Sequence, residues 1–327
     1  MKRAAVLSIL VVVMLLPVAV IAEAQQAAKV PRIGVLMAGS RSIAKPRLEA
    51  FQEGLRELGY VEGKNVVLEY RYAEGRPETL PKRVEELVQL KVDVIVTETS
   101  NATQAAKKAT TTIPVVFATA NDPVGDGHVA SLARPGGNIT GFSNLASELN
   151  GKKLELLKET VSKLTRVAFL LRWGTSIGEQ RFNETEIAAK DLGLRLLPLS
   201  AKGNEDLESA FSAVSADAEA LIVSPSTFSI EHRRRLIELT AKYRLPAIYP
   251  SPLFVEAGGL MSYGPDLINN WRRAAIYVDK ILKDTKPAEL PIEQPKKFEF
   301  VINLKTAKQI GLTIPPTVLA RVDKVIK

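Results

Sequence analysis

The segment RIGVL at residues 32–36, followed by LEAFQEGLRELG at residues 48–59, combines a buried strand with an amphipathic helix. Phe51 and Leu55 lie on one face of that helix, and Gly59 provides a C-terminal cap. Strand-like and helical runs continue to alternate through residues 66–70, 80–90, 92–96 and 115–118. The near-continuous apolarity of the strand-like runs predicts parallel strands covered by helices on both faces.

A loop rich in proline and glycine, residues 134–141, separates this series from a second one with strand-like runs at residues 166–171, 194–199, 220–223 and 246–249. One sheet with so many parallel strands would exceed the usual size. We therefore predict an α/β protein with two doubly wound parallel-sheet lobes. If the C-terminal segments return to the first lobe and then to the second, the chain crosses between the lobes three times and forms a three-crossover hinge. The expected boundaries are residues 30–143 plus 260–287 for the N-terminal lobe and 144–259 plus 288–327 for the C-terminal lobe.

Residues 1–24 have the layout of a signal peptide. Two basic residues precede an apolar run that ends in an Ala-Glu-Ala triplet resembling a cleavage site. The run is nearly long enough to span a bilayer, so an uncleaved anchor is the alternative. We expect export to the periplasm, cleavage near Ala24 and a soluble mature protein. The chain has no cysteine, so burial of the core alone must stabilise the exported lobes.

The net charge of +8 is spread along the chain. The densest basic cluster, residues 232–235, begins an amphipathic helix, and we interpret it as a solvated face rather than a nucleic-acid contact. We therefore expect no nucleic-acid partner.

Several long strings identify a family. They are residues 49–51 (EAF), 54–60 (GLRELGY), 131–141 (SLARPGGNITG), 254–264 (FVEAGGLMSYG), 301–307 (VINLKTA) and 311–312 (GL). Over nearly all of residues 30–327 the chain resembles the substrate-binding proteins of ABC transporters related to tryptophan-type amino-acid receptors. The resemblance implies a type I periplasmic-binding-protein fold, a small-molecule ligand clamped between the lobes, and docking of the closed form on an ABC transporter permease in the inner membrane. The better-known members of this family bind aromatic or branched amino acids.

Ligands of open parallel sheets bind beyond the carboxyl ends of the strands. In the first lobe the loops at these ends contain Ser40, Thr99, Ser100, Asn121 and Asp122. A helix start at Thr99 and Ser100 could hold a ligand carboxylate through backbone N–H groups and hydroxyls, although Ser100 could instead act only as an N-cap. Asp122 could pair with a ligand ammonium group, although Asn-Asp-Pro is also an ordinary turn sequence.

In the second lobe the corresponding candidates are Asn144, Arg172, Trp173, Ser224, Ser226, Tyr249 and Tyr263. Arg172 could pair with a carboxylate and Trp173 could stack on a flat ligand, or both could be rim residues. Many relatives have Asn-Pro where this chain has Trp173-Gly174, so ligand contacts carried over to that loop are open. Tyr263 could contribute from the hinge, although packing explains it almost as well.

The sequence lacks the motifs of an enzyme. Neither histidine, His128 or His232, lies at metal-ligand spacing from a second ligand, and no glycine-rich phosphate loop follows a strand. We expect no catalytic residue, no metal and no cofactor, and a monomeric receptor that delivers its ligand to a permease. An exported sensor that feeds a signalling receptor, and an exported enzyme, are the alternatives.

Overall fold

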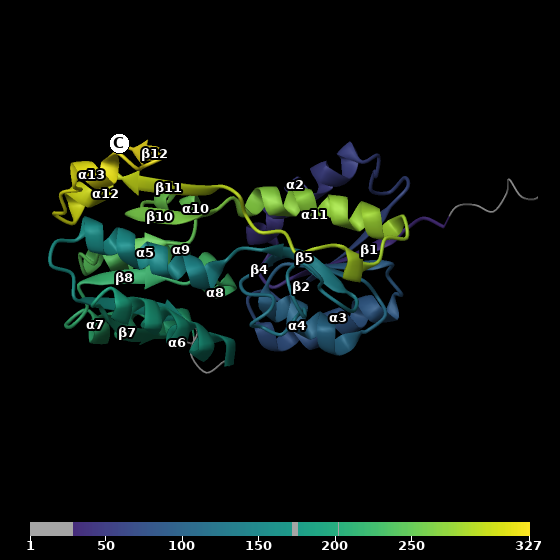
Figure 1. Cartoon of the computed structure of the whole chain (residues 1–327), viewed down its shortest axis with the longest axis horizontal. Coiled ribbons are helices and arrows are strands. Elements are labelled where there is room, and N and C mark those ends of the chain that lie inside the picture. Colours follow the sequence, from purple (N-terminus) through teal and green to yellow (C-terminus); the bar gives the residue numbers. More distant parts are fainter. Residues whose placement is uncertain (1–28, 172–175, 202) are drawn as a thin grey trace, which may run out of the picture.

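The protein forms two α/β lobes that lie end to end along its longest axis (Figure 1). The computed structural model describes residues 29–171, 176–201 and 203–327. The predicted signal peptide lies outside these residues.

A five-stranded parallel sheet of order β2-β1-β3-β4-β5 is the centre of the first lobe. Ile33 of β1 is in register with Leu68 of β2 on one side and Val94 of β3 on the other. The last strand begins inside the proline- and glycine-rich loop, so the chain completes this sheet before it leaves the lobe. The elements of this part are β1 (Arg32–Met37), α2 (Arg41–Glu57), β2 (Val67–Tyr72), η1 (Pro77–Thr79), α3 (Leu80–Gln89), β3 (Val94–Thr97), α4 (Ser100–Ala109), β4 (Val115–Ala120) and β5 (Ile139–Ser143).

The second lobe contains a seven-stranded sheet of order β12-β11-β10-β9-β8-β6-β7. Every pairing in it is parallel except that between β10 and β11. Its elements are α5 (Ala146–Thr160), β6 (Arg166–Leu171), α6 (Ser176–Asp191), β7 (Arg195–Ser200), α7 (Asn204–Val214), β8 (Ala220–Val223), α8 (Thr227–Glu231), α9 (Arg233–Lys242), β9 (Ala247–Tyr249), α10 (Pro252–Glu256), β10 (Met261–Pro265), β11 (Phe298–Asn303), α12 (Leu304–Gln309), α13 (Pro316–Leu319) and β12 (Lys324–Ile326).

Three connections join the lobes. The chain leaves the first sheet after β5, returns from β10 to α11 (Leu267–Leu282) and η2 (Pro287–Glu289), and crosses again to β11. We expected residues 260–266 in the first lobe, but Met261–Pro265 pairs with β9 and β11 of the second sheet. We expected the second lobe to resume at residue 288, but residues 290–293 belong to the first lobe, because the N–H of Ile292 donates to the carbonyl of Leu132 (2.7 Å) and that of Glu293 to the carbonyl of Gly141 (3.0 Å).

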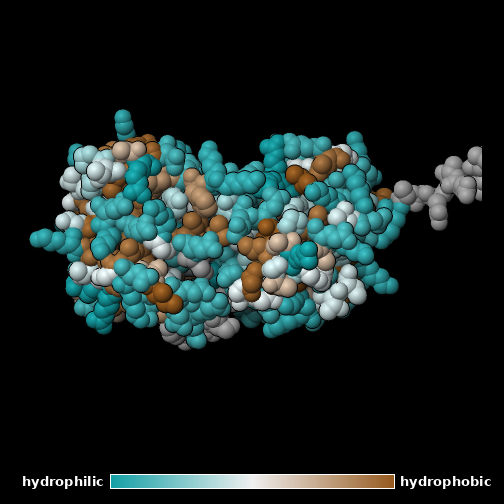
Figure 2. Space-filling view, in the orientation of Figure 1, coloured by the Kyte–Doolittle hydropathy of each residue, from teal (hydrophilic) through white to brown (hydrophobic). Residues whose placement is uncertain are grey.

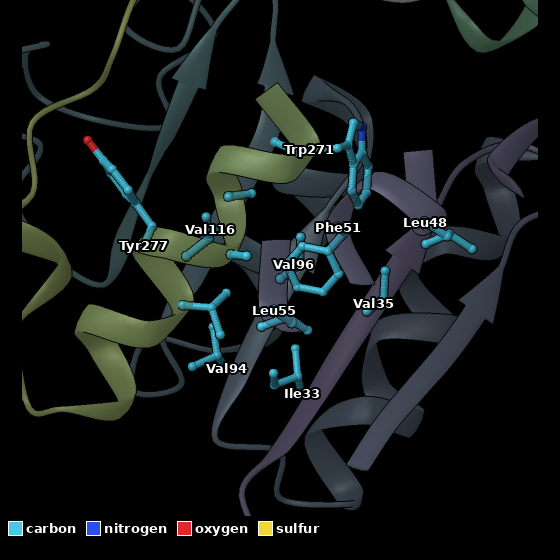
Figure 3. Packing of buried hydrophobic residues seen from close by; sticks show 14 of the residues in the cluster. Ile33, Val35, Leu48, Phe51, Leu55, Val94, Val96, Val116, Trp271 and Tyr277 are labelled. Carbon is cyan, nitrogen blue, oxygen red and sulfur yellow. The ribbon is translucent and has the colours of Figure 1, made fainter. Parts of the chain in front are cut away.

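Helices α2 and α11 cover one face of the first sheet. Phe51 of α2 and Trp271 of α11 meet edge to face with their ring centroids 6.2 Å apart, and both side chains are fully buried above Val94 and Val96 (Figure 3). A Cβ at Gly54 would lie 2.3 Å from the carbonyl oxygen of Arg272, so glycine at this position lets the two helices approach closely. The returning helix is therefore an integral part of the first core.

Apolar side chains cover the other sheet faces in the same way. Leu80, Leu87 and Ala106 of α3 and α4 pack on the opposite face of the first sheet. In the second lobe, α5 packs on Phe169 and Ile302, while Leu207 and Leu236 of α7 and α9 pack on the other face. In the described ranges, no helix is both long enough and apolar enough to cross a membrane.

Candidate binding site between the lobes

A cavity of about 690 Å³ lies between the lobes. Ala38 follows β1 and Glu98 follows β3, the neighbouring strands at which the order of the first sheet reverses. Ser224 follows β8, and Arg181 lies on the helix after β6, at the equivalent reversal of the second sheet. The cavity therefore lies where doubly wound sheets bind ligands. In Figure 2, hydrophilic residues cover most of the visible face, and hydrophobic residues appear on both sides of the boundary between the lobes.

Glu98 and Arg47 form a buried ion pair in the cavity wall, with exposed fractions of 3% and 7%. Oε2 of Glu98 also accepts the backbone N–H groups of Ala38 (2.7 Å) and Gly39 (3.0 Å). Three donors therefore compensate the buried carboxylate, which ties the start of α2 to the end of β3. We predicted no role for either residue. The available signal was an acidic residue directly after an apolar strand.

Thr99 and Ser100 both line the cavity at the start of α4. Thr99 is the N-cap, because its Oγ1 accepts the N–H of Ala102 at 3.3 Å. Ser100 is not the cap, which corrects that alternative. Its Oγ accepts the N–H of Asn121 at 3.1 Å and so connects the ends of β3 and β4.

Asn121 and Asn144 face each other where the chain leaves the first lobe. Nδ2 of Asn144 donates to Oδ1 of Asn121 at 2.9 Å, and the backbone N–H of Asn144 donates to the carbonyl of Ala120 at 2.8 Å. Both residues line the cavity. Oδ1 of Asn144 is buried and accepts no hydrogen bond from any described residue, which leaves one acceptor free in the wall.

The side chain of Arg181, in the second lobe, reaches across to the first lobe. Its Nη2 donates to Oδ1 and Oδ2 of Asp126, at 2.9 and 3.1 Å, and both side chains are buried. Within the part of the chain that the structure describes, Nε and Nη1 of Arg181 have no acceptor. His128 is also buried, with Nε2 3.8 Å from Asp126, and burial lowers the pKa of His128 more than the Asp126 carboxylate raises it. Sequence reasoning missed Arg181, because the helical pattern of α6 does not show which face meets the other lobe.

The wall contributed by the second lobe combines hydroxyls with apolar groups. Ser226 caps α8, with its Oγ accepting the N–H of Ser229 at 3.0 Å, and Ser224 precedes it. Both serines line the cavity together with Phe228 and Ile230, and Leu80 faces it from the first lobe.

Comparison with known proteins shows which family has this architecture. The model of the ABC transporter substrate binding protein family matches residues 33–326. The chain belongs to that family. This confirms the predicted family and its type I periplasmic-binding-protein fold.

Relatives of this substrate-binding protein extend over most of its length. A tyrosine-binding protein of Clostridioides difficile is 23% identical over 84% of this chain and 80% of its own length. Among solved structures, a conserved domain protein from Vibrio cholerae is 28% identical, with a TM-score of 0.85 over 91% of this chain and 100% of that one. An ABC domain in complex with L-Trp from Streptococcus pneumoniae is 25% identical, with a TM-score of 0.83 over 90% of this chain and 99% of that one.

Six of the predicted site residues line the cavity of this substrate-binding protein: Thr99, Ser100, Asn121, Asn144, Ser224 and Ser226. Arg172 and Trp173 lie outside the described residues.

Four predicted residues lie elsewhere in the substrate-binding protein. The carboxylate of Asp122 accepts the N–H of Gly125 at 2.9 Å within its own turn. Tyr249 is fully buried in the second core, where its hydroxyl and that of Thr240 are 2.9 Å apart. Tyr263 stacks on Phe298 in the second sheet, with ring centroids 5.9 Å apart. Ser40 is the N-cap residue of α2 and contacts the other lobe through its backbone N–H.

Proposed function

We propose that this protein is the periplasmic receptor of an ABC importer, which captures a small molecule between its lobes and delivers it to a membrane permease. The interlobe cavity carries this proposal, because its walls come from the strand ends of both sheets. Only a closed form lets one ligand contact both walls, so binding shifts the equilibrium toward closure. Family membership supports the transport context, and the N-terminal sequence supports export with cleavage near Ala24.

The proposed ligand is an amino acid or a similar carboxylate with an aromatic or branched side chain. The charges of Arg47 and Glu98 balance each other, so the wall that contains them favours a ligand without net charge. Phe228, Ile230 and Leu80 offer an apolar surface for the side chain. The volume is also in the range of small-molecule sites, which is roughly 300–1,000 Å³. The tyrosine-binding and L-Trp-bound relatives support the same class.

A thermal-shift panel of the twenty amino acids, aromatic acids, sugars and nucleosides tests this proposal. A cognate ligand at about a hundred times its dissociation constant adds roughly 2.7 kcal/mol to the free energy of unfolding and raises the melting temperature. We expect the largest shift from an aromatic or branched amino acid. If only sugars or nucleosides stabilise the protein, the amino-acid class is wrong. If no compound does so, the receptor proposal is contradicted.

Native mass spectrometry and small-angle scattering complete the test. The purified protein is expected to carry one small molecule per chain, and the radius of gyration is expected to fall when ligand is added to stripped protein. A radius that is the same with and without saturating ligand contradicts closure. Conversion of a bound compound into a new species would favour an enzyme.

A further inference from the structure

The guanidinium of Arg181 is only partly satisfied in the cavity wall. Two of its hydrogen bonds go to Asp126 of the opposite lobe, whereas Nε and Nη1 find no acceptor among the described residues. Arg181 is 5% exposed and lines the cavity. A buried donor without an acceptor is costly, and more so when it is charged, so an unpaired donor in a native structure calls for an explanation.

The groups around the Arg181–Asp126 pair include a buried histidine and a lysine. Asp126 supplies one negative charge, while Arg181 and Lys107 supply two positive charges around the buried His128. Lys107 donates to the carbonyl of Gly127, so it lies against the same loop. His128 stays neutral near pH 7 because burial lowers its pKa. A ligand carboxylate would supply acceptors for the two guanidinium nitrogens that have none among the described residues.

We propose that Arg181 anchors the anionic group of the ligand while Asp126 holds the same guanidinium from the opposite lobe. The inference rests on the proposed receptor function and names a specificity-determining residue for it. Asp126 acts as a positioning residue. The same guanidinium then binds the ligand and links the two lobes. Asp126 of the first lobe holds the guanidinium in position for the ligand only when the lobes are close together. The free Oδ1 of Asn144 supplies an acceptor in the same cavity for a cationic end of the ligand.

The test compares carboxylates with their primary amides on the intact mature protein. The probes are L-tryptophan, L-tyrosine, L-leucine and benzoate, each paired with its primary amide, and dissociation constants are measured by titration calorimetry. The variants are Arg181→Gln and Arg181→Lys. Arg233→Gln is the matched control, because Arg233 also has a buried Nε without a partner but does not belong to the cavity lining. Glucose and uridine serve as neutral probes.

We expect the wild type to bind a carboxylate at least about 50-fold more tightly than its amide. Arg181→Gln is expected to weaken that carboxylate at least about 30-fold more than its amide, because both ligands lose the link to Asp126 but only the carboxylate loses its anchor, with Arg181→Lys in between and Arg233→Gln unchanged. If Arg181 had only a structural role, its substitution would weaken the binding of acid and amide equally. The ratio of the two dissociation constants therefore separates a ligand anchor from an effect on folding. Melting curves of both arginine variants confirm that they fold.

The following outcomes would contradict the anchor or the proposed function. A carboxylate that binds the wild type and Arg181→Gln with the same affinity overturns the anchor and leaves the receptor function standing. Equal weakening of acid and amide also overturns it. Binding of glucose or uridine alone overturns both the anchor and the amino-acid class. Binding of no probe, charged or neutral, contradicts the receptor function itself.

Discussion

The backbone N–H of Ser40, at the start of α2 in the first lobe, donates to Oε1 of Glu231, at the end of α8 in the second lobe, over 3.2 Å. Gly75 of the first lobe packs against the same carboxylate, and a Cβ at that position would collide with it. Arg181 and Asp126 form a second link between the lobes. Together these contacts bring the lobes into the arrangement that encloses the cavity.

Removal of the Glu231 carboxylate is expected to loosen the lobes. A hydrogen bond to a charged group contributes about 1.5–3 kcal/mol, so Glu231→Ala is predicted to raise the open population of ligand-free protein about tenfold or more. Small-angle scattering measures this as a larger radius of gyration. Glu238→Ala is the control, because Glu238 is exposed and pairs with Arg235 of its own helix. Equal radii for the two variants would contradict the prediction.

Asp126→Asn is expected to be strongly destabilising. It leaves the buried charge of Arg181 without a counter-charge, which costs about 3–5 kcal/mol in comparable buried pairs. Urea unfolding followed by circular dichroism measures the loss. Asp122→Asn, four residues earlier, is the control, because asparagine can still cap the N–H of Gly125 and the expected change is below about 1 kcal/mol. Similar losses in both variants would show that the ion pair contributes little.

The burial of Lys153 predicts that the free energy of unfolding depends on pH. It is 1% exposed, its Nζ lies 3.3 Å from Oδ1 of Asn150, and burial lowers its pKa to about 7. The unfolded chain binds this proton up to the ordinary lysine pKa near 10.4, so between about pH 7 and pH 10 the unfolded state holds more protons and stability rises with pH.

Lys153→Met is therefore expected to raise the free energy of unfolding by about 3–5 kcal/mol at or below pH 7, because methionine removes the buried charge. The gain is predicted to shrink as the pH rises toward 10. Urea titrations from pH 6 to pH 10 measure it, with the exposed Lys190→Met as the control. A gain that is constant from pH 6 to pH 10 would contradict the lowered pKa, because it would show that Lys153 holds its proton equally in the folded and the unfolded protein.

Two helical glycines are expected to respond in opposite directions to the same substitution. Gly54→Ala places a methyl group against the backbone of Arg272 and is predicted to cost about 1–3 kcal/mol. The methyl group added by Gly151→Ala would contact only the Cβ of Ala188, at 3.6 Å. This substitution is predicted to stabilise α5 by about 0.5–1 kcal/mol. Thermal denaturation distinguishes them. Equal effects would mean that α2 and α11 can separate without cost.

Much of the fold follows from local pattern. The β-branched runs and the amphipathic stripe with Phe51 and Leu55 specify strands and helices, because burial of one helical face and of both strand faces leaves a periodic signature. The rule that ligands bind at strand ends places Thr99, Ser100, Asn121 and Ser226 in the cavity. The lobe assignment of β10 does not follow from such a pattern, because pairing partners are distant in sequence.

The sequence by itself determined the family, the two-lobed α/β architecture and the strand-end loops that line the cavity. Only the tertiary structure decided which side chains of those loops face inward, since Tyr249 turns into a core and Asp122 into its own turn. It also decided the roles of Arg181 and Glu98, whose partners lie 55 and 51 residues away. Contacts between distant residues depend on how lobes and helices pack, and periodicity carries no record of that geometry.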